Sequence, residues 1–223
     1  LNTTRNTSPG FHGVYIAQGG SFDTLSSYLS GQYVAGKTTV SASGEGFVTD
    51  RYLDPPATTN YTNHASSTAF NGSIEHDFND TNRLRVSLLN QQTWLQVPDD
   101  LLQEQAGQRQ DRTSGATEGQ VSYQHVFSPT LLGSIRGSIR DVSASLCSNP
   151  LSTPVSASQD RGYREGYWDA SMAGSAVRNE WKAGTQGRYA SVNERFGYDI
   201  VADSIDGVPI FDGDLPPSFR FRG

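Results

Sequence analysis

The side chains best suited to catalysis or metal binding are few and scattered in this sequence. The four histidines are His12, His64, His76 and His125, and Cys147 is the only cysteine. Zinc sites need several such ligands at short, regular spacings, which these residues do not have. No Gly-x-Ser-x-Gly segment marks a serine nucleophile. We therefore predict no catalytic, metal-binding or cofactor-binding residue, and a protein that is not an enzyme.

Acidic residues cluster near the C-terminal end, at Asp199, Asp203, Asp206, Asp212 and Asp214. Oxygen-rich spacing of this kind can hold Ca²⁺. Aspartate also favours turns, because its side chain hydrogen-bonds to the nearby backbone. The turn interpretation is the preferred one, and the calcium interpretation stays open.

The elements that position these residues are revealed by alternation of apolar and polar side chains with a period of two. From 70 to 78 one side of the chain carries large or apolar residues, and the other carries Asn71, Ser73, Glu75 and Asp77. The same alternation recurs over 25–33, 84–88, 121–127, 131–139, 168–174 and 181–189. Such a pattern is typical of antiparallel strands with one apolar and one polar face. It slips near 140–144 and 192–196, where a bulge or an exit from the membrane would explain the change.

The connections between these strands are of two unequal kinds. Short turns lie at 35–37, 79–82, 128–130 and 177–179, whereas longer segments with Pro, Gly, Asp and Asn lie at 51–64, 98–117, 147–160 and 201–217. Within the second of these, 98–106 resembles a short helix with acidic residues in its first turn. Short turns at one end and long loops at the other are typical of outer-membrane barrels. We therefore predict an all-β, antiparallel, up-and-down transmembrane barrel wall, present in part as about 9–10 strands.

Composition agrees with this prediction. Hydrophobic residues make up 35% of the 223 residues, low for a soluble core, while aromatics reach 10% and the net charge is only −6. No apolar run is long enough for a transmembrane helix, but strands need only about 9–11 residues to cross. Acidity and the lack of a Lys/Arg cluster argue against nucleic acid as a partner. Leu1 begins no signal peptide, so we expect the start of the gene product to be missing.

Two further predictions concern side chains on the strands. Aromatic residues near strand ends are expected to form a girdle at the membrane interfaces, rather than the core of a soluble sandwich. These are Phe78, Tyr123, Phe127, Trp168 and Trp181. Charged residues on the opposite face are expected to form a polar interior. These are Arg83, Arg85, Arg136, Arg140, Lys182 and Arg188, with Glu75, Asp77, Asp169 and Glu180.

Several segments carry a resemblance to a known family of proteins. They are 5–13, 20–24, 49–56, 70–72, 107–113, 123–129 and Asn193-Glu194-Arg195-Phe196-Gly197-Tyr198. Through them, nearly the whole chain resembles the TonB-dependent outer-membrane receptors that carry a carboxypeptidase-regulatory-like domain at the N-terminus. The resemblance rests on overall pattern, since this barrel has no short diagnostic motif.

The resemblance implies that 1–10 are the end of a plug domain or linker and that 11–223 are the N-terminal part of the barrel. It implies strands near 12–19, 22–34 and 38–50, six more after them, and a tenth opening at 219–222. Such a receptor takes up a scarce solute, such as an iron chelate, a cobamide or an oligosaccharide or peptide, through its extracellular loops. Its expected partners are outer-membrane lipid and lipopolysaccharide, its own plug and TonB, in the outer membrane of a Gram-negative-type bacterium.

Two alternatives stay open. One is an outer-membrane channel or adhesin barrel that uses no energy from TonB. The other is a secreted all-β module that binds carbohydrate and would be a soluble monomer. A barrel piece is instead expected to aggregate without detergent, because its end strands are unpaired edges.

Overall fold

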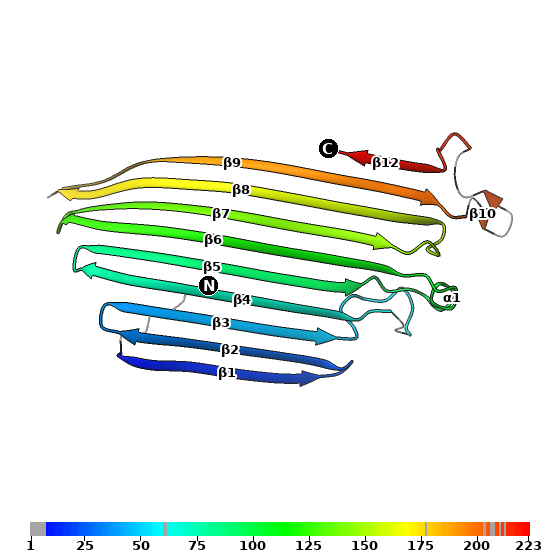
Figure 1. The fold of residues 1–223 in the computed structure, drawn as a ribbon, viewed down its shortest axis with the longest axis horizontal. Coiled ribbons are helices and arrows are strands. Elements are labelled where there is room, and N and C mark those ends of the chain that lie inside the picture. Colours follow the sequence, from blue (N-terminus) through cyan, green and yellow to red (C-terminus); the bar gives the residue numbers. More distant parts are fainter. Residues whose placement is uncertain are drawn as a thin grey trace.

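The computed structural model describes residues 8–59, 62–176, 178–202, 204–205, 208–209, 211 and 213–223. Ten strands form one antiparallel sheet in the order β1-β2-β3-β4-β5-β6-β7-β8-β9-β12. Neighbours in the sheet are consecutive along this main path, so the topology is up-and-down (Figure 1). The bounds are β1 Gly10–Gly20, β2 Thr24–Ala35, β3 Thr38–Thr49, β4 Ala65–Asn79, β5 Asn82–Gln96, β6 Gln110–Ser128, β7 Leu131–Ser148, β8 Val155–Ala176, β9 Asn179–Ile200 and β12 Ser218–Arg222.

Three small elements lie at the end of the sheet that carries the long loops. Helix α1, Leu101–Gln105, lies between β5 and β6, and β10, Ser204–Ile205, pairs with β11, Val208–Pro209. The short helix predicted at 98–106 is therefore confirmed, with Asp100 as its N-cap. The β10–β11 pair was not predicted. Among the described residues, no helix has the length and apolar character needed to span a membrane.

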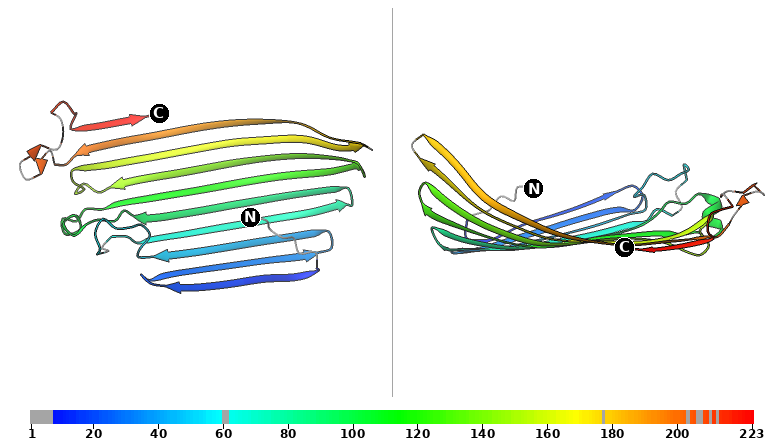
Figure 2. Two further views of the ribbon diagram at one scale, coloured as in Figure 1. Left: turned by 180° about the vertical axis from the view of Figure 1, so that it is seen from behind. Right: turned by 90° about the horizontal axis from the view of Figure 1, so that it is seen from above.

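The sheet is a single curved layer that does not close on itself. Its two edges are β1 and β12, and no described strand pairs with their outer sides. Two views from other directions show the curvature and no second layer of described strands on either face (Figure 2). Among the described residues, the buried hydrophobic ones are only Val34, Ala65, Leu95 and Ala116. The usual two-layer core of a soluble domain is therefore absent from the described structure.

The register is continuous along the long strands, so one face of the sheet can be followed from strand to strand. β6 and β7 pair without a shift from Gln110↔Ser148 to Val126↔Leu132, and β8 and β9 pair without a shift throughout. The predicted slips near 140–144 and 192–196 are therefore not bulges. The irregularities lie instead at the short turns, between Asp77 and Asn79 and between Val126 and Ser128.

The short turns are staggered. Thr38, at the β2–β3 turn, pairs with His76 of β4, and β4 continues past this pair to Asn79. In the same way, Asn82 at the β4–β5 turn pairs with His125 of β6, and β6 continues past it to Ser128. Each hairpin therefore reaches beyond the preceding one, as Figure 1 shows at the left edge. Stagger of this kind accompanies the strand tilt of barrel walls.

The predicted strands are confirmed, with different lengths at the loop end. The expected segments 12–19, 22–34, 38–50 and 219–222 correspond to β1, β2, β3 and β12. β6 begins at Gln110 and β8 at Val155, so the predicted loops 98–117 and 147–160 were too long. At these strand ends both faces of the sheet are polar. The sequence therefore shows no alternation, although the hydrogen-bonded strand pairing continues. Of the predicted plug segment 1–10, residues 1–7 lie outside the described residues.

Candidate functional site: the two faces of the sheet and the loop cluster

Apolar side chains of neighbouring strands are brought to one face by the register. Val40, Ile74, Val86 and Val121 stand in one cross-strand row, and Leu84, Tyr123, Ile135 and Ala170 stand in another. Directly opposed residues point to the same side of a sheet, so these rows share a face. Among the most exposed apolar side chains on this face, Ile139 is 67% exposed and Tyr189 is 73% exposed. We call this surface the apolar face.

The apolar face is limited in height along the strands. On β7 the residues that point to it are apolar or small from Leu131 to Ile139, and the next one is Asp141. On β8 they run from Gly174 back to Gly166, and the next one is Arg164, whose Nη2 lies 2.6 Å from Asp141 Oδ2. Each apolar stretch is therefore as long as a tilted strand needs to cross a hydrocarbon core. Beyond it the strands continue with polar residues toward the long loops.

Two aromatic pairs mark the short-turn end of the apolar face. His76 and Phe78 stand edge to face, with ring centroids 4.7 Å apart, and His125 and Phe127 repeat this arrangement at 4.3 Å. Both phenylalanines lie at the bulges next to a short turn. Each pair has the same position relative to its own turn. The predicted girdle at a membrane interface stays a prediction.

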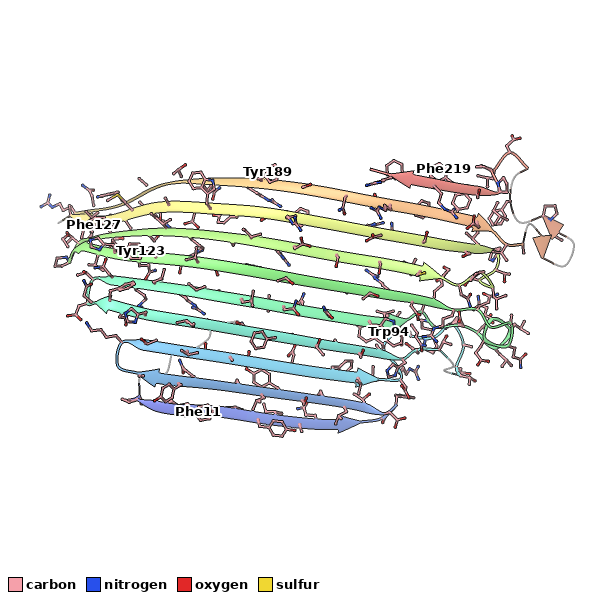
Figure 3. All side chains as sticks on the ribbon, in the orientation of Figure 1. Phe11, Trp94, Tyr123, Phe127, Tyr189 and Phe219 are labelled. Carbon is pink, nitrogen blue, oxygen red and sulfur yellow. The ribbon has the colours of Figure 1, made fainter. Side chains whose placement is uncertain are left out.

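Other predicted girdle residues are distributed differently. Trp181 lies at the start of β9, opposite Gly174, whereas Trp168 lies in the interior of β8, opposite Gly137 and Gly187. The expectation that Trp168 sits near a strand end was therefore wrong. Figure 3 shows Phe127 and Tyr123 near the short-turn end and Trp94 near the long-loop end.

The opposite surface, which we call the polar face, carries cross-strand ion pairs. Arg83 Nε lies 2.7 Å from Asp77 Oδ1 and 3.5 Å from Glu75 Oε1. Arg136 lies 4.0 Å from Asp169 on the neighbouring strand. The predicted charged face is thus present. Arg85 also stands directly opposite Glu75, and Lys182 and Glu180 lie on the same side.

Sequence reasoning missed several acidic partners on the polar face. Glu118 lies 3.9 Å from Arg140, and Glu165 lies 2.6 Å from Arg188. Glu194 pairs with Arg161 at 3.0 Å. These carboxylates point to the same face as the predicted arginines. Extending the alternation by a few residues on β6, β8 and β9 would therefore have found them.

The long-loop end holds the most closely packed polar cluster of the described structure. Asn63 is 1% exposed, and its side-chain oxygen accepts hydrogen bonds from the backbone of Tyr52 at 3.1 Å and Leu53 at 2.9 Å. Thr62 Oγ1 donates to Val97 O at 3.2 Å and accepts from Asp99 N at 2.9 Å. These bonds tie the loop before β4 to the loop after β5. We call this region, 50–59 and 62–64 with 96–109 and 148–154, the loop cluster.

The remaining contacts of the loop cluster extend to the loop between β7 and β8. Asn149 accepts from Arg109 N at 3.2 Å and donates to Gly107 O at 2.7 Å. Ser152 donates to Arg109 O at 3.2 Å. The Arg109 guanidinium also lies 6.0 Å from the centre of the Trp94 ring. The loops therefore form an ordered, polar surface with an aromatic and a cationic group at its base.

Asp99 is the buried acid of this cluster, at 7% exposed. Burial raises the pKa of the Asp99 carboxyl above its ordinary value, a hydrogen bond with Thr62 opposes this, and Asp100 and Glu104 add to the rise. Asp100 caps α1 by accepting from Gln103 N at 2.9 Å, and Gln103 Oε1 accepts from Asp100 N at 2.9 Å. This reciprocal capping box holds the start of α1 beside the buried acid.

The four histidines are engaged separately. His12 contacts Ser8 O at 3.0 Å, and His64 lies 2.6 Å from Asp50. His76 bonds to Thr38 at 2.8 Å, and His125 bonds to Asn82 at 2.5 Å. In the described part of the chain, no group of three His, Cys, Asp or Glu side chains is placed to hold a metal ion. Of the acidic segment, Asp203, Asp206 and Asp212 lie outside the described residues, so the calcium interpretation stays untested.

One sequence match has a structural explanation that differs from its usual meaning. Residues 31–38 read Gly-x-x-x-x-Gly-Lys-Thr, the pattern of a phosphate-binding loop. That loop needs a strand followed by a helix, whose N-terminal amides hold the phosphate. Here Gly31 lies in β2, Gly36 has φ +57° in a hairpin turn, and Thr38 begins β3. The segment is therefore a β-hairpin, with no helix after it to hold a phosphate.

Comparison with known proteins found no match to any protein-family model, curated protein or solved structure.

Proposed function

We propose that the sheet is part of the wall of an outer-membrane β-barrel, and that the protein is a TonB-dependent receptor for active uptake of a scarce solute. One observation carries the proposal: an apolar face that no other described strand covers, limited in height, backs onto a face of ion pairs in continuous register. Water is a poor environment for the first face and hydrocarbon is a poor one for the second. A barrel wall between lipid and an aqueous interior suits both.

The asymmetry of the connections supports the same proposal. Asn79 pairs with Asn82, so the turn between β4 and β5 contains only Asp80 and Thr81. The connection between β3 and β4 is much longer and covers 50–64. Short turns on the periplasmic side and longer loops outside the cell are the pattern of outer-membrane barrels. In this orientation the loop cluster faces the medium, and it is the surface that would bind the solute. The open edges β1 and β12 would pair with further strands of the barrel.

The proposal of a receptor goes beyond the proposal of a barrel wall. It rests on the family resemblance carried by the seven segments given above, of which 5–13 is the first and 193–198 the last. A passive channel or adhesin would share the wall but would need neither plug nor TonB. In the proposed receptor the polar face would contact the plug, and energy from TonB would move the plug to admit the solute. A secreted carbohydrate-binding sandwich has less support, because such a fold covers its apolar face with a second sheet.

Three tryptophans allow a direct test of the wall. Chains that keep only Trp94, Trp168 or Trp181 are inserted into vesicles of phospholipids with brominated acyl chains, which quench tryptophan on contact. Trp168 and Trp181 should be quenched, and Trp94, which lies at the loop end, should not. A soluble monomer with no quenching of Trp168 refutes the wall. For the receptor, loss of the gene and loss of TonB should abolish uptake of the same solute. Uptake that persists without TonB indicates the passive channel.

A further inference from the structure

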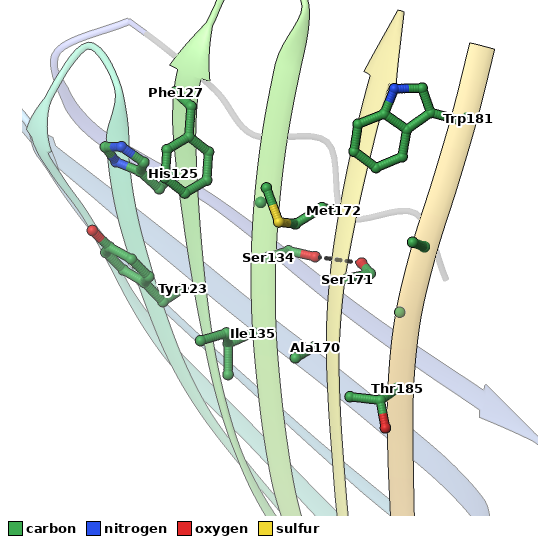
Figure 4. A pocket seen from close by; sticks show the side chains of 13 residues that line it. Tyr123, His125, Phe127, Ser134, Ile135, Ala170, Ser171, Met172, Trp181 and Thr185 are labelled. Carbon is green, nitrogen blue, oxygen red and sulfur yellow. Dashed lines mark hydrogen bonds between the residues drawn. The ribbon is translucent and has the colours of Figure 1, made fainter.

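A hollow of about 580 Å³ interrupts the apolar face near its short-turn end (Figure 4). One wall is formed by Tyr123, His125 and Phe127 on β6, and the other by Trp181 on β9. β7 and β8 lie between these walls and form the floor. Its volume is within the roughly 300–1,000 Å³ that small-molecule sites usually have.

The hollow exists because the side chains between the large rings, among them a glycine and two alanines, extend less far from the sheet than the rings do. Along one row, His125 is followed by Gly133, Met172 and Ala183 on successive strands, and the next row includes Ala170. Three strand spacings separate β6 from β9, which is about 14 Å. The rings therefore stand as two ridges, and the low residues between them leave an open channel along the strand direction.

The chemistry of the hollow calls for an apolar occupant. Of its polar side chains, His125 and Tyr123 both hydrogen-bond to Asn82 Oδ1. Ser134 and Ser171 bond to each other at 3.0 Å, and their register places them on the polar face. Few hydrogen-bonding groups are left for a ligand. The exceptions are the Trp181 indole N–H at the rim and the Thr185 hydroxyl, which make no hydrogen bond with any described residue.

We infer that the hollow binds one acyl chain of a phospholipid of the membrane leaflet on the short-turn side. This inference rests on the proposed barrel wall, since it takes the apolar face to lie against lipid. The hollow is continuous with that face and opens beside the short turns, which makes the inner leaflet its neighbour. Trp181 at the rim has the apolar body and polar N–H that suit the level where chain meets headgroup. Arg178, in the adjacent turn, adds a positive charge for the phosphate.

The test uses the full chain with Trp181 as its only tryptophan. The chain is inserted into vesicles of brominated phosphatidylethanolamine and then moved into lipid-free detergent, which removes loosely bound lipid. A retained acyl chain keeps Trp181 quenched, and native mass spectrometry should find one phospholipid per chain. Full recovery of Trp181 fluorescence with no retained phospholipid overturns the inference.

Two variants make the test specific. Ala183→Phe fills the hollow beside Trp181 and should abolish both the retained lipid and the persistent quenching. Ala42→Phe makes the same change on the apolar face of β3, outside the hollow, and should retain the lipid. Equal retention by both variants, or equal loss, overturns the inference. A chain that keeps Trp168 alone reports the wall separately: quenching of Trp168 in the vesicles with no lipid retained means that the wall stands and the lipid site does not.

Discussion

The indole of Trp168 lies across Gly187, its direct partner on the neighbouring strand. A Cβ at Gly187 would fall 2.6 Å from Trp168 Cε2, well inside van der Waals contact. Trp181 covers Gly174 in the same way, with Cε2 2.6 Å from the corresponding position. A ring over a glycine shields the exposed backbone and favours the register in which the two residues stand opposite each other. These pairs therefore help to hold the sheet in register without a core beneath it.

Replacing Gly187 by alanine should destabilise the sheet, because the Trp168 ring must leave its place. Overpacking of this kind costs about 1–3 kcal/mol of unfolding free energy. The measurement is urea unfolding of the chain in vesicles, followed by tryptophan fluorescence. Gly166→Ala is the matched control on the same face, since a Cβ there meets nothing within 4 Å. A loss of stability in Gly166→Ala as large as in Gly187→Ala would contradict the ring contact as the cause.

Two consecutive leucines provide a test of the two faces. Leu88 points to the apolar face and is 48% exposed, whereas Leu89 points to the polar face, opposite Asn71 and Glu118. Leu88→Arg should lower the free energy of unfolding in lipid by about 1 kcal/mol, because arginine would enter the hydrocarbon near the end of the apolar stretch, where Asn90 follows on the same face. Leu89→Arg should be tolerated, since Glu118 faces it. The measurement is unfolding in vesicles, and equal effects of the two substitutions would show that the faces do not differ in environment.

The faces and the hairpins could be predicted because they follow from a period of two. A strand with lipid or solvent on one side and polar partners on the other must alternate, and the segments 70–78 and 84–88 do so clearly. The same argument predicted the turns at Gly36 and at Asp80, where glycine and aspartate suit tight reversals. Arg83 and Asp77 were both assigned to the polar face, and the structure shows that they form an ion pair there.

What could not be predicted depends on residues far apart in the sequence. The pairing of Asp141 with Arg164 lies beyond the apolar stretch, where both faces are polar and alternation is silent. The burial of Asn63 and Asp99 comes from loops that meet only after the strands have paired. The hollow between Phe127 and Trp181 likewise depends on how β6 and β9 are aligned along the strand direction. That alignment is set by the register of the strands between them, which the sequence pattern does not show.

Asn63→Ala should loosen the loop that follows β3. The change removes the acceptor for Tyr52 N and Leu53 N and the donor to Leu53 O at 2.6 Å. Loss of buried hydrogen bonds costs about 1–3 kcal/mol, so trypsin should cleave after Arg51 roughly tenfold faster or more. Asn90→Ala removes an exposed bond to Thr117 and should leave that cleavage rate unchanged. Unaltered cleavage after Arg51 in Asn63→Ala would show that Asn63 does not hold this loop.

The loop cluster should depend on pH through Asp99. Its pKa is raised in the folded state, chiefly by burial, so the folded chain holds the proton at a pH where the unfolded chain has released it. The stabilising effect is therefore complete below the ordinary carboxyl pKa and is lost as pH rises through the raised value. Above that range the cluster holds a buried negative charge next to Asp100 and Glu104.

Asp99→Asn removes this charge and keeps the size of the side chain, so it should protect the cluster most at neutral pH. Hydrogen exchange of the amides in 97–106 is compared between the variant and the unchanged chain at each pH, which cancels the intrinsic dependence of exchange on pH. The difference should be largest at pH 7 and vanish in acid. Asp100→Ala serves as the opposite control, because it removes the cap of α1 at Gln103 N and should speed exchange. Slower exchange in Asp100→Ala, or a gain in Asp99→Asn that persists in acid, would place the effect elsewhere than in the buried charge of Asp99.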